Sequence, residues 1–460
     1  MYLGEEIVAD QIVNNFENHL FEVLQNYGIG KNFYIAFSGG MDSSVLLDAA
    51  HRLREKGKIK SLSAVHVNHK LQQNADQWHS HCQQICQQYQ IPFYSTVLKW
   101  PDGKTSDSEE MARKGRYDYF IQLMKVNDIL LFAHHQDDQA ETLLFRLIRG
   151  TGIDGAKGMP IYRSLGKGHL LRPFLQLTRD QIETYAKKIK LRWVADPSNN
   201  DEKFARNYLR HQIIPKLKSR WPNCQSNLAR FTEIATRQSV LLDEIAEQDL
   251  QSLKSEKIHC CMESYPAIEI FKLLELTEIR MQNVLHYWGK KYGLAAPGFV
   301  EIENLINQLS AAKRQSIQVG FSGKCVRSYK GILYLLENEV ISPLRKSEVW
   351  SDITKPLELA NGMHLHAHQT LAKGIRLPQK DEQVIVSPRK GGERCLPEYR
   401  NKTTDLKKIY QELDVPPWLR EVLPVIYYND EIVAVPQVFT SKPFINTNEQ
   451  KQSSILFGLR

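Results

Sequence analysis

The segment 33–47, FYIAFSGGMDSSVLL, constrains the fold of this chain more than any other stretch. Residues 33–37 are apolar or aromatic, which is typical of a buried strand. Ser38 and two glycines then break the pattern, and Asp42 and Ser43 can cap a helix whose apolar residues follow directly. The segment therefore predicts a strand, a glycine turn and a helix in succession.

The turn itself suits an anion, because glycines let a ligand approach the backbone and a helix start offers free N–H groups. It lacks the lysine of a G-x-x-x-x-G-K-[ST] loop and the spacing of G-x-G-x-x-G. It does match SGGxDS over 38–43, and so resembles the pyrophosphate (PP) loop of the ATP pyrophosphatase superfamily. That resemblance implies that ATP is split into AMP and pyrophosphate. An ordinary Gly-rich turn is the simpler alternative.

Composition indicates a soluble protein with reduced cysteines and room for an anionic partner. The 460-residue chain has a formal net charge of +8, which is modestly basic. Its seven cysteines include no C-x-x-C pair, so neither a disulfide framework nor a zinc ribbon is indicated. No apolar run approaches the roughly 18–20 residues of a membrane span, and the N-terminus lacks the apolar core of a signal peptide. We expect a cytoplasmic protein with no membrane partner.

Residues 1–217 have the pattern of an α/β domain with a doubly wound, Rossmann-like parallel sheet. Further strands are expected at 61–68, 92–98 and 129–133, alternating with helices at 77–89, 106–125 and 137–149. Ligands of such sheets bind beyond the carboxyl ends of the strands, where the SGG turn also lies. The glycine-rich residues 150–172 predict a flexible surface loop, and a further helix is expected at 178–189.

The rest of the chain predicts smaller domains. Residues 218–340 combine helical periodicity with short strands, which indicates a helical or α+β middle domain. Residues 341–382 lack strong periodicity and predict a linker. Residues 383–460 predict a small α+β C-terminal domain, with a hairpin signature at 425–435.

A second motif, AHHQDDQAET at 133–142, follows the strand expected at 129–133. Asp137 and Glu141 are four residues apart and share one helix face. These carboxylates can simply stabilise the start of the helix. Alternatively, they can hold Mg²⁺ on a triphosphate or the amino group of an acceptor. The pattern H-x-x-D-D differs from H-E-x-x-H, which argues against a zinc site.

Basic residues form two further candidate features. Arg113 and Arg116 lie on one face of an expected helix, where a guanidinium can stabilise charge on a phosphate or simply pair with acids on a solvated surface. The segment 203–220 contains no acid, and Lys203, Arg206 and Arg210 are its candidate RNA contacts. A second basic segment, 389–408, includes acids and is explained equally well as solvated surface.

Several motifs occur together and in one order: SGGMDSS, HVNHxL, ARxxRY, AHHxDDQAET and FxRNxLR. In this combination the chain resembles the tRNA(Ile)-lysidine synthetase family, densely over 30–215 and more loosely over 278–336 and near the C-terminus. The resemblance implies that ATP adenylates the wobble cytidine of the CAU-anticodon tRNA(Ile). Free L-lysine then displaces AMP to give lysidine, which shifts codon reading from AUG to AUA. It also implies that the middle and C-terminal domains bind tRNA.

The resemblance assigns roles to individual residues. The ATP loop would consist of Ser38, Gly39, Gly40, Met41, Asp42 and Ser43. Asp42, Arg113, His134 and Asp137 would be catalytic, and Asp42 and Asp137 would be associated with Mg²⁺. The base that deprotonates lysine stays open, with Asp137 and His134 as candidates. The chain departs from the family in one turn, where residues 435–437 are Val-Pro-Gln and a glycine is expected.

Other functions stay open. One is a PP-loop tRNA thiolation enzyme, although the C-x-x-x-C spacing of Cys82 and Cys86 is not that of a cluster ligand pair. A small-molecule ligase of the GMP or NAD synthetase kind fits the basic segment 203–220 less well. A non-catalytic tRNA-binding protein fits the intact 38–43 loop less well. The oligomeric state is not readable from the sequence, and we keep a homodimer open.

Overall fold

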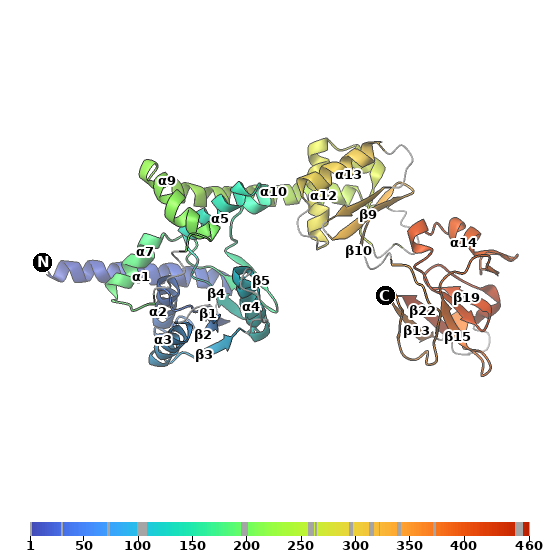
Figure 1. The fold of residues 1–460 in the computed structure, drawn as a ribbon, viewed down its shortest axis with the longest axis horizontal. Helices are drawn as coiled ribbons and strands as arrows, with labels where there is room; N and C mark the ends of the chain where they lie inside the picture. Colours follow the sequence, from blue (N-terminus) through green and yellow to red (C-terminus); the bar gives the residue numbers. More distant parts are fainter. Residues whose placement is uncertain are drawn as a thin grey trace. The chain divides into compact units, whose positions relative to one another are not determined.

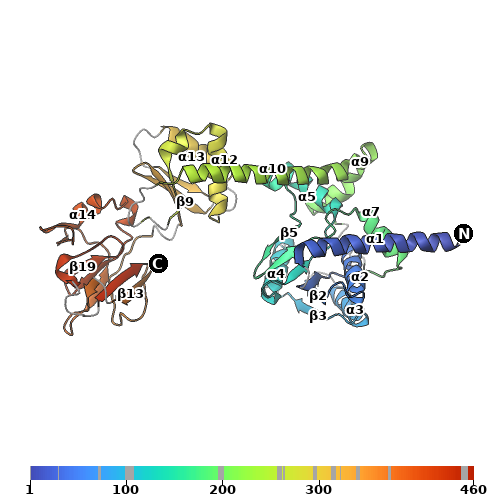
Figure 2. The same cartoon turned by 180° about the vertical axis from the view of Figure 1, so that it is seen from behind.

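The computed structural model describes residues 2–28, 31–70, 74–98, 108–194, 201–255, 262, 265–293, 298–311, 317–321, 323–337, 342–370, 374–446 and 454–459. The chain forms two compact units, residues 1–240 and residues 241–460. Figure 1 shows the elements of both units in sequence colours, and Figure 2 shows them from behind.

A six-stranded sheet organises the first unit, with the order β3-β2-β1-β4-β6-β5. Its parallel strands are β1 (Asn32–Ala36), β2 (Ser61–Asn68), β3 (Phe93–Val97), β4 (Ile129–Leu131) and β6 (Gly168–Leu171). The edge strand β5 (Tyr162–Leu165) pairs antiparallel with β6. The predicted doubly wound α/β fold is confirmed, and the strand order reverses between β1 and β4.

Helices cover both faces of this sheet. They are α1 (Tyr2–Gly28), α2 (Met41–Glu55), α3 (Ala75–Gln88), α4 (Ser108–Leu123), α5 (Gln136–Ile148) and α7 (Arg179–Lys188). Because side chains alternate along a strand, Phe33 and Ile35 of β1 enter the core that contains residues of α1, α2 and α7. Tyr34 packs on the opposite side, in the cluster that contains Phe120 of α4.

The glycine-rich residues 150–172 are not the flexible loop that we expected. They form a short helix α6 (Ile153–Ala156) and the strands β5 and β6. Leu170 and Leu171 are fully buried, and β6 lies between β4 and β5 in the sheet. Gly166 turns the hairpin with a φ of +57°, and a Cβ at Gly168 would meet the Asp128 carbonyl at 2.6 Å. The glycines therefore permit close packing rather than mobility.

The basic segment 203–220 is helical from Ala205 onwards. It contains α8 (Ala205–Tyr208), a π-helical turn (Leu209–Ile213) and α9 (Ile214–Arg220), and α10 (Cys224–Ser252) follows. The domain boundary that we predicted after residue 217 falls inside α9, and the compact first unit extends to residue 240.

The second unit begins with a four-stranded sheet of order β7-β10-β9-β8. Its strands are β7 (Ala267–Glu269), β8 (Gln318–Phe321), β9 (Lys324–Tyr329) and β10 (Ile332–Glu337). The helices α12 (Glu278–Lys291) and α13 (Phe299–Ala311) contribute Trp288 and Leu305 to a core that also contains Leu333 of β10.

Residues 342–459 build two five-stranded sheets, with the orders β11-β15-β18-β19-β20 and β12-β13-β22-β14-β21. The first contains the predicted hairpin, β18 (Val425–Tyr428) and β19 (Glu431–Val435). The other strands are β11 (Glu348–Val349), β12 (Leu357–Glu358), β13 (His364–Thr370), β14 (Gly374–Arg376), β15 (Val384–Ser387), β20 (Phe439–Thr440), β21 (Ile445–Asn446) and β22 (Ser454–Leu459). The small pair β16 (Arg394–Cys395) and β17 (Thr404–Asp405) and the helix α14 (Leu406–Glu412) complete this region.

Our prediction of a linker at 341–382 is wrong for the described residues in this range. The four strands β11 to β14 lie in this range, and Trp350 and Leu365 are buried in the C-terminal core. The strands are short or rich in polar residues, and β13 pairs with β22, which is far away in the sequence. Local periodicity therefore gave no signal.

Candidate active site

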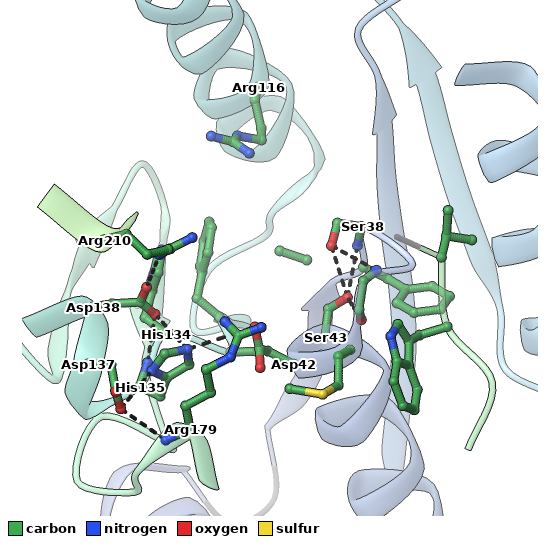
Figure 3. Close-up of a pocket in the computed structure, with 18 of the residues that line it drawn as sticks. Ser38, Asp42, Ser43, Arg116, His134, His135, Asp137, Asp138, Arg179 and Arg210 are labelled. Carbon is green, nitrogen blue, oxygen red and sulfur yellow. Dashed lines mark hydrogen bonds and ion pairs between the residues drawn. The ribbon is translucent and has the colours of Figure 1, made fainter. Parts of the chain in front are cut away.

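A pocket of about 1010 Å³ opens at the carboxyl ends of β1, β2 and β4. It lies where the strand order reverses, which is the usual ligand site of an open α/β sheet. In Figure 3, Ser38 and Ser43 lie on one side of this pocket, and His135, Asp137 and Asp138 lie on the other. The loop predicted to bind phosphate and the acidic motif thus face the same space.

Hydrogen bonds of its own serines fix the conformation of the phosphate loop. The Ser43 hydroxyl donates to the Gly40 carbonyl at 3.0 Å and lies 3.0 Å from the Ser38 hydroxyl. Gly39 has a φ of +83°, and a Cβ there would lie 2.9 Å from the Cys82 sulfur, so only glycine fits. Helix α2 begins directly after Gly40, which turns its first N–H groups towards the loop.

His135 lies at the centre of the acidic motif and is almost completely buried. Its Nε2 is 3.8 Å from Asp42 Oδ2 and 3.5 Å from Asp138 Oδ2, and its Nδ1 is 3.6 Å from Asp137 Oδ2. Burial alone would lower the pKa of His135, but these carboxylates outweigh burial and raise it. These carboxylates therefore favour the charged form of the imidazole, which offsets part of the negative charge of the cluster.

Arg210 supplies the second cation. Its Nε and Nη2 donate to both oxygens of Glu141, at 2.6 and 2.7 Å, and Nη2 also donates to Asp138 at 3.1 Å. Glu141 is 5% exposed, and burial raises its pKa although Arg210 acts in the opposite direction. We predicted Arg210 as an RNA contact; the structure places its guanidinium in the pocket, bound to two carboxylates.

Asp137 and Asp42 differ in how many acceptor positions they have left. Asp137 accepts from the Arg179 backbone N–H at 2.9 Å and from Gln225 Nε2 at 2.6 Å, one bond on each oxygen. Burial opposes ionisation of Asp137, but His135 and these donors lower its pKa to about 2. Asp42, by contrast, has a buried Oδ1 without a hydrogen-bond donor, and burial raises its pKa.

These differences decide which residue fits a metal ion. Mg²⁺ on a nucleotide needs one or two carboxylates in addition to phosphate oxygens. Asp42 belongs to the phosphate loop, and its Oδ1 without a hydrogen-bond donor suits that role, whereas each oxygen of Asp137 already accepts one hydrogen bond. Within the described ranges, no group of three or more His, Cys, Asp or Glu side chains forms a metal site by itself.

The other end of the pocket is basic and aromatic. Arg113, Arg116 and Tyr117 of α4 line it. The guanidinium of Arg113 lies over the Tyr117 ring at 5.4 Å, and that of Arg163 lies over it at 5.3 Å. Burial would raise the pKa of Tyr117, but these arginines outweigh burial and lower it. This end of the pocket is therefore suited to an anion.

Comparison with known proteins identifies the family. Residues 12–217 match the PP-loop domain, residues 269–334 the TilS substrate binding domain, and residues 384–457 the TilS substrate C-terminal domain. The chain is 38% identical to a tRNA(Ile)-lysidine synthase of Coxiella burnetii over 88% of each chain. It is 35% identical to one of Legionella pneumophila, over 93% of this chain and 95% of that one. The chain belongs to the tRNA(Ile)-lysidine synthase family.

Solved structures also resemble parts of this family member. The TILS C-terminal domain is 21% identical over 25% of this chain and 97% of that chain, with a TM-score of 0.21. A U34-tRNA thiolase from Methanococcus maripaludis is 14% identical over 49% of this chain and 78% of that chain, with a TM-score of 0.42.

The structure of this family member brings most predicted site residues together. The lining includes Ser38, Gly40, Met41, Asp42, Ser43, Arg113, His134, Asp137 and Arg210, and Gly39 forms the adjoining turn. Lys203 and Arg206 are outside the lining. Among the described parts of the chain, no helix is long and apolar enough to cross a membrane.

Sequence reasoning missed Arg172, Arg179 and Gln225. Each comes from a different element and reaches the acidic motif only in the folded chain. One local signal was present: Thr178 and Gln181 form a capping box at the start of α7, which fixes the Arg179 N–H that Asp137 accepts.

Proposed function

We propose that this chain uses ATP to ligate free L-lysine to the wobble cytidine of the CAU-anticodon tRNA(Ile). The observation that carries this proposal is that the phosphate loop and the acidic motif share one pocket at the switch in strand order. The family relationship supports the reaction, since the curated relatives are tRNA(Ile)-lysidine synthases. The product, lysidine, would shift codon reading from AUG to AUA.

In this proposal ATP lies with its β- and γ-phosphates at the loop 38–43. The start of α2 and the loop N–H groups supply donors for those phosphates. Asp42 would hold Mg²⁺ through its oxygen that has no hydrogen-bond donor, and the ion would supply positive charge at the phosphates. Arg113 lines the basic end of the pocket, where it stabilises charge on the α-phosphate.

Adenylation of the cytidine base prepares it for the second step, in which the lysine amine attacks. The carbonyl oxygen of cytidine is a poor leaving group, and transfer of AMP to it makes displacement feasible. Lysine must then attack as a neutral amine, although its free pKa is about 10.4. Asp137, with a pKa of about 2, and His134, with a pKa lowered by burial to about 4, are weak bases. We therefore propose that desolvation inside the pocket lowers the pKa of the amine, which releases its proton to water before it attacks.

We propose that tRNA contacts come from the basic segment 203–220 and from the middle and C-terminal domains. Lys203 is exposed, and the ring of Tyr208 is 49% exposed and could stack on a base. Arg206 stays a predicted RNA contact. Arg210 is assigned instead to the pocket, because both Glu141 and Asp138 already bind it.

A thiolation enzyme is the second candidate, and the burial of Cys82 and Cys86 argues against a role for these two residues in it. Thiolation needs an accessible, reactive sulfur. Cys82 and Cys86 are buried, and burial raises the pKa of Cys86 to about 12. Neither forms part of the pocket lining.

The proposal is tested by incubating the chain with ATP, labelled lysine and an unmodified CAU-anticodon tRNA(Ile) transcript. We expect label in the RNA and one AMP released per lysine incorporated, with the CAU-anticodon tRNA(Met) as the control that stays unlabelled. Label from a sulfur donor in place of lysine would favour thiolation. Exchange of pyrophosphate into ATP that does not require RNA would also contradict adenylation of the base.

Location and assembly belong to the same proposal. We propose a cytoplasmic enzyme, since its tRNA substrate is there, and we keep the homodimer as a prediction. Light scattering of the purified chain, with and without tRNA, tests the second point.

A further inference from the structure

Arg172 is a buried cation that lies beside the pocket without lining it. It follows β6 directly and is 3% exposed. Its Nη1 donates to the Pro160 carbonyl at 2.6 Å, and its Nε donates to His134 Nδ1 at 3.2 Å. No ion pair joins it to a carboxylate within the described ranges. Burial lowers the pKa of Arg172 to about 10, so the guanidinium is still charged at neutral pH.

This contact decides where the proton of His134 lies. An arginine N–H can only donate, so Nδ1 of His134 must accept and the proton of the neutral ring lies on Nε2. The ring orientation is also restrained, because it stacks on Phe132 with a centroid distance of 5.3 Å and an interplanar angle of 3°. His134 lines the pocket, and Nε2 has no hydrogen-bond partner among the described residues.

Burial and the neighbouring cations keep His134 neutral. Burial is the main cause that lowers its pKa to about 4. Arg172, Arg116 and His135 lower it further, and Asp138 acts in the opposite direction. A neutral imidazole with a fixed Nε2–H is a hydrogen-bond donor that loses no proton when it binds an anion.

We propose that Arg172 is a positioning residue that holds His134 as a neutral Nε2–H donor for an anionic oxygen of the reacting substrate. The basic end of the pocket favours a phosphate oxygen, because Arg113 and Arg116 line it and the guanidinium of Arg163 lies over the Tyr117 ring. This inference rests on the proposed function for the identity of that oxygen. The tautomer itself does not depend on it.

The simplest competing explanation is that Arg172 only anchors the backbone through Pro160. The two explanations differ in what happens to the His134 ring. If Arg172 acts on His134, removal of its Nε–H frees Nδ1 and allows both tautomers. If Arg172 only anchors residue 160, the tautomer is unchanged.

The direct test is ¹⁵N NMR of the whole chain labelled in histidine, with His134 assigned by the variant His134→Gln. We expect the wild type to carry its proton on Nε2 at pH 7, and Arg172→Met to show a tautomer mixture and protonation at a higher pH. Arg163→Met is the matched control: Arg163 shares its neighbour Tyr117 with Arg172 but does not contact His134, so its loss should leave the tautomer unchanged. A wild-type proton on Nδ1, or an unchanged tautomer in Arg172→Met, would overturn the proposal.

Kinetics add an independent readout. We expect Arg172→Met to lower kcat for lysidine formation by about 100-fold, a typical cost of misplacing a reacting group, with little change in the KM for tRNA. In the background of His134→Gln, loss of Arg172 should cost much less, because the two residues act as one unit. Full additivity of the two losses would refute a role through His134.

A folding defect of Arg172→Met and a failure of the proposed function can both be distinguished from a failure of this inference. If Arg172→Met does not fold, Arg172→Lys keeps the charge but loses the planar donor, and the same tautomer measurement applies. If the wild type shows the expected tautomer but incorporates no lysine, the proposed function fails and the positioning role of Arg172 stands.

Discussion

The ion pair of Arg210 with Glu141 offers a sharp test of how the pocket is built. The perturbation is Arg210→Met, which keeps a long apolar side chain and removes the guanidinium. It leaves Glu141, which is 5% exposed, without its bidentate partner, and it also removes a donor from Asp138. The loss therefore affects two carboxylates at once.

The size of the loss in unfolding free energy follows from how deeply the ion pair is buried. Removing one partner of a buried ion pair costs about 3–5 kcal/mol. The side chain of Arg210 is 31% exposed, so water can partly replace it, and we take the lower value of about 3 kcal/mol. For a unit of this size, about 2–4 °C in Tm corresponds to each kcal/mol, which predicts a Tm lower by roughly 6–12 °C.

The stability loss of Arg210→Met should depend on pH, and the pKa of Glu141 decides in which direction. Burial already raises the pKa of Glu141, so folding favours its protonated form and stability is lost as pH rises through that pKa. Without Arg210 the pKa rises further. The deficit of Arg210→Met should therefore be larger at pH 8 than at pH 5, and adding Glu141→Gln should recover part of it.

Thermal unfolding measured by circular dichroism checks this prediction, with Lys187→Met as the control. Lys187 pairs with Glu183 but its side chain is 68% exposed, so its loss should cost less than about 1 kcal/mol. A Tm of Arg210→Met within about 1 °C of the wild type would refute the reasoning.

Three further predictions concern the loop, the acidic motif and the RNA. Gly39→Ala should abolish RNA-dependent pyrophosphate exchange, because its Cβ would meet the Cys82 sulfur at 2.9 Å, whereas Gly57→Ala, with a φ of +68° and nothing within 4 Å, should keep exchange. Asp137→Asn should lower the free energy of unfolding by about 2 kcal/mol at pH 7, because folding lowers the pKa of Asp137 from 3.8 to about 2. This stabilisation is present above pH 4 and disappears as the pH falls towards 2. Equal stability of the two proteins in urea at pH 7 would contradict this prediction. Arg206→Glu should weaken tRNA binding and reduce its salt dependence without lowering Tm. Filter binding at several salt concentrations measures both effects, and an unchanged affinity would contradict the prediction.

Much of the first unit could be predicted because its signals are local. The strand at 61–68 was predicted with the bounds that β2 has, and the helix predicted at 137–149 differs from α5 by one residue at each end. The errors lie where pairing is distant. Strand β6 joins the parallel sheet through β4, although it also pairs with its neighbour β5, and β13 pairs with the distant β22.

The site divides in the same way. The phosphate loop was readable because the hydrogen bonds among its own serines and glycines connect residues no more than five apart, such as Ser38 and Ser43, although the Val194 N–H also donates to the Gly39 carbonyl. Arg210 was assigned to RNA because a basic segment without acids is typical of such contacts. Its partner Glu141 lies 69 positions away, so no local pattern could pair them.

The sequence alone therefore determined the βα unit of 33–47 and its suitability for phosphate, because glycine conformation and helix N–H groups depend on adjacent residues. Only the tertiary structure decided which carboxylates keep a free oxygen and which nitrogen of His134 carries its proton. Gln225 satisfies Asp137 across 88 positions, and Arg172 satisfies His134 across 38. Burial and hydrogen-bond partners set protonation in the pocket, and the fold supplies both from distant parts of the chain.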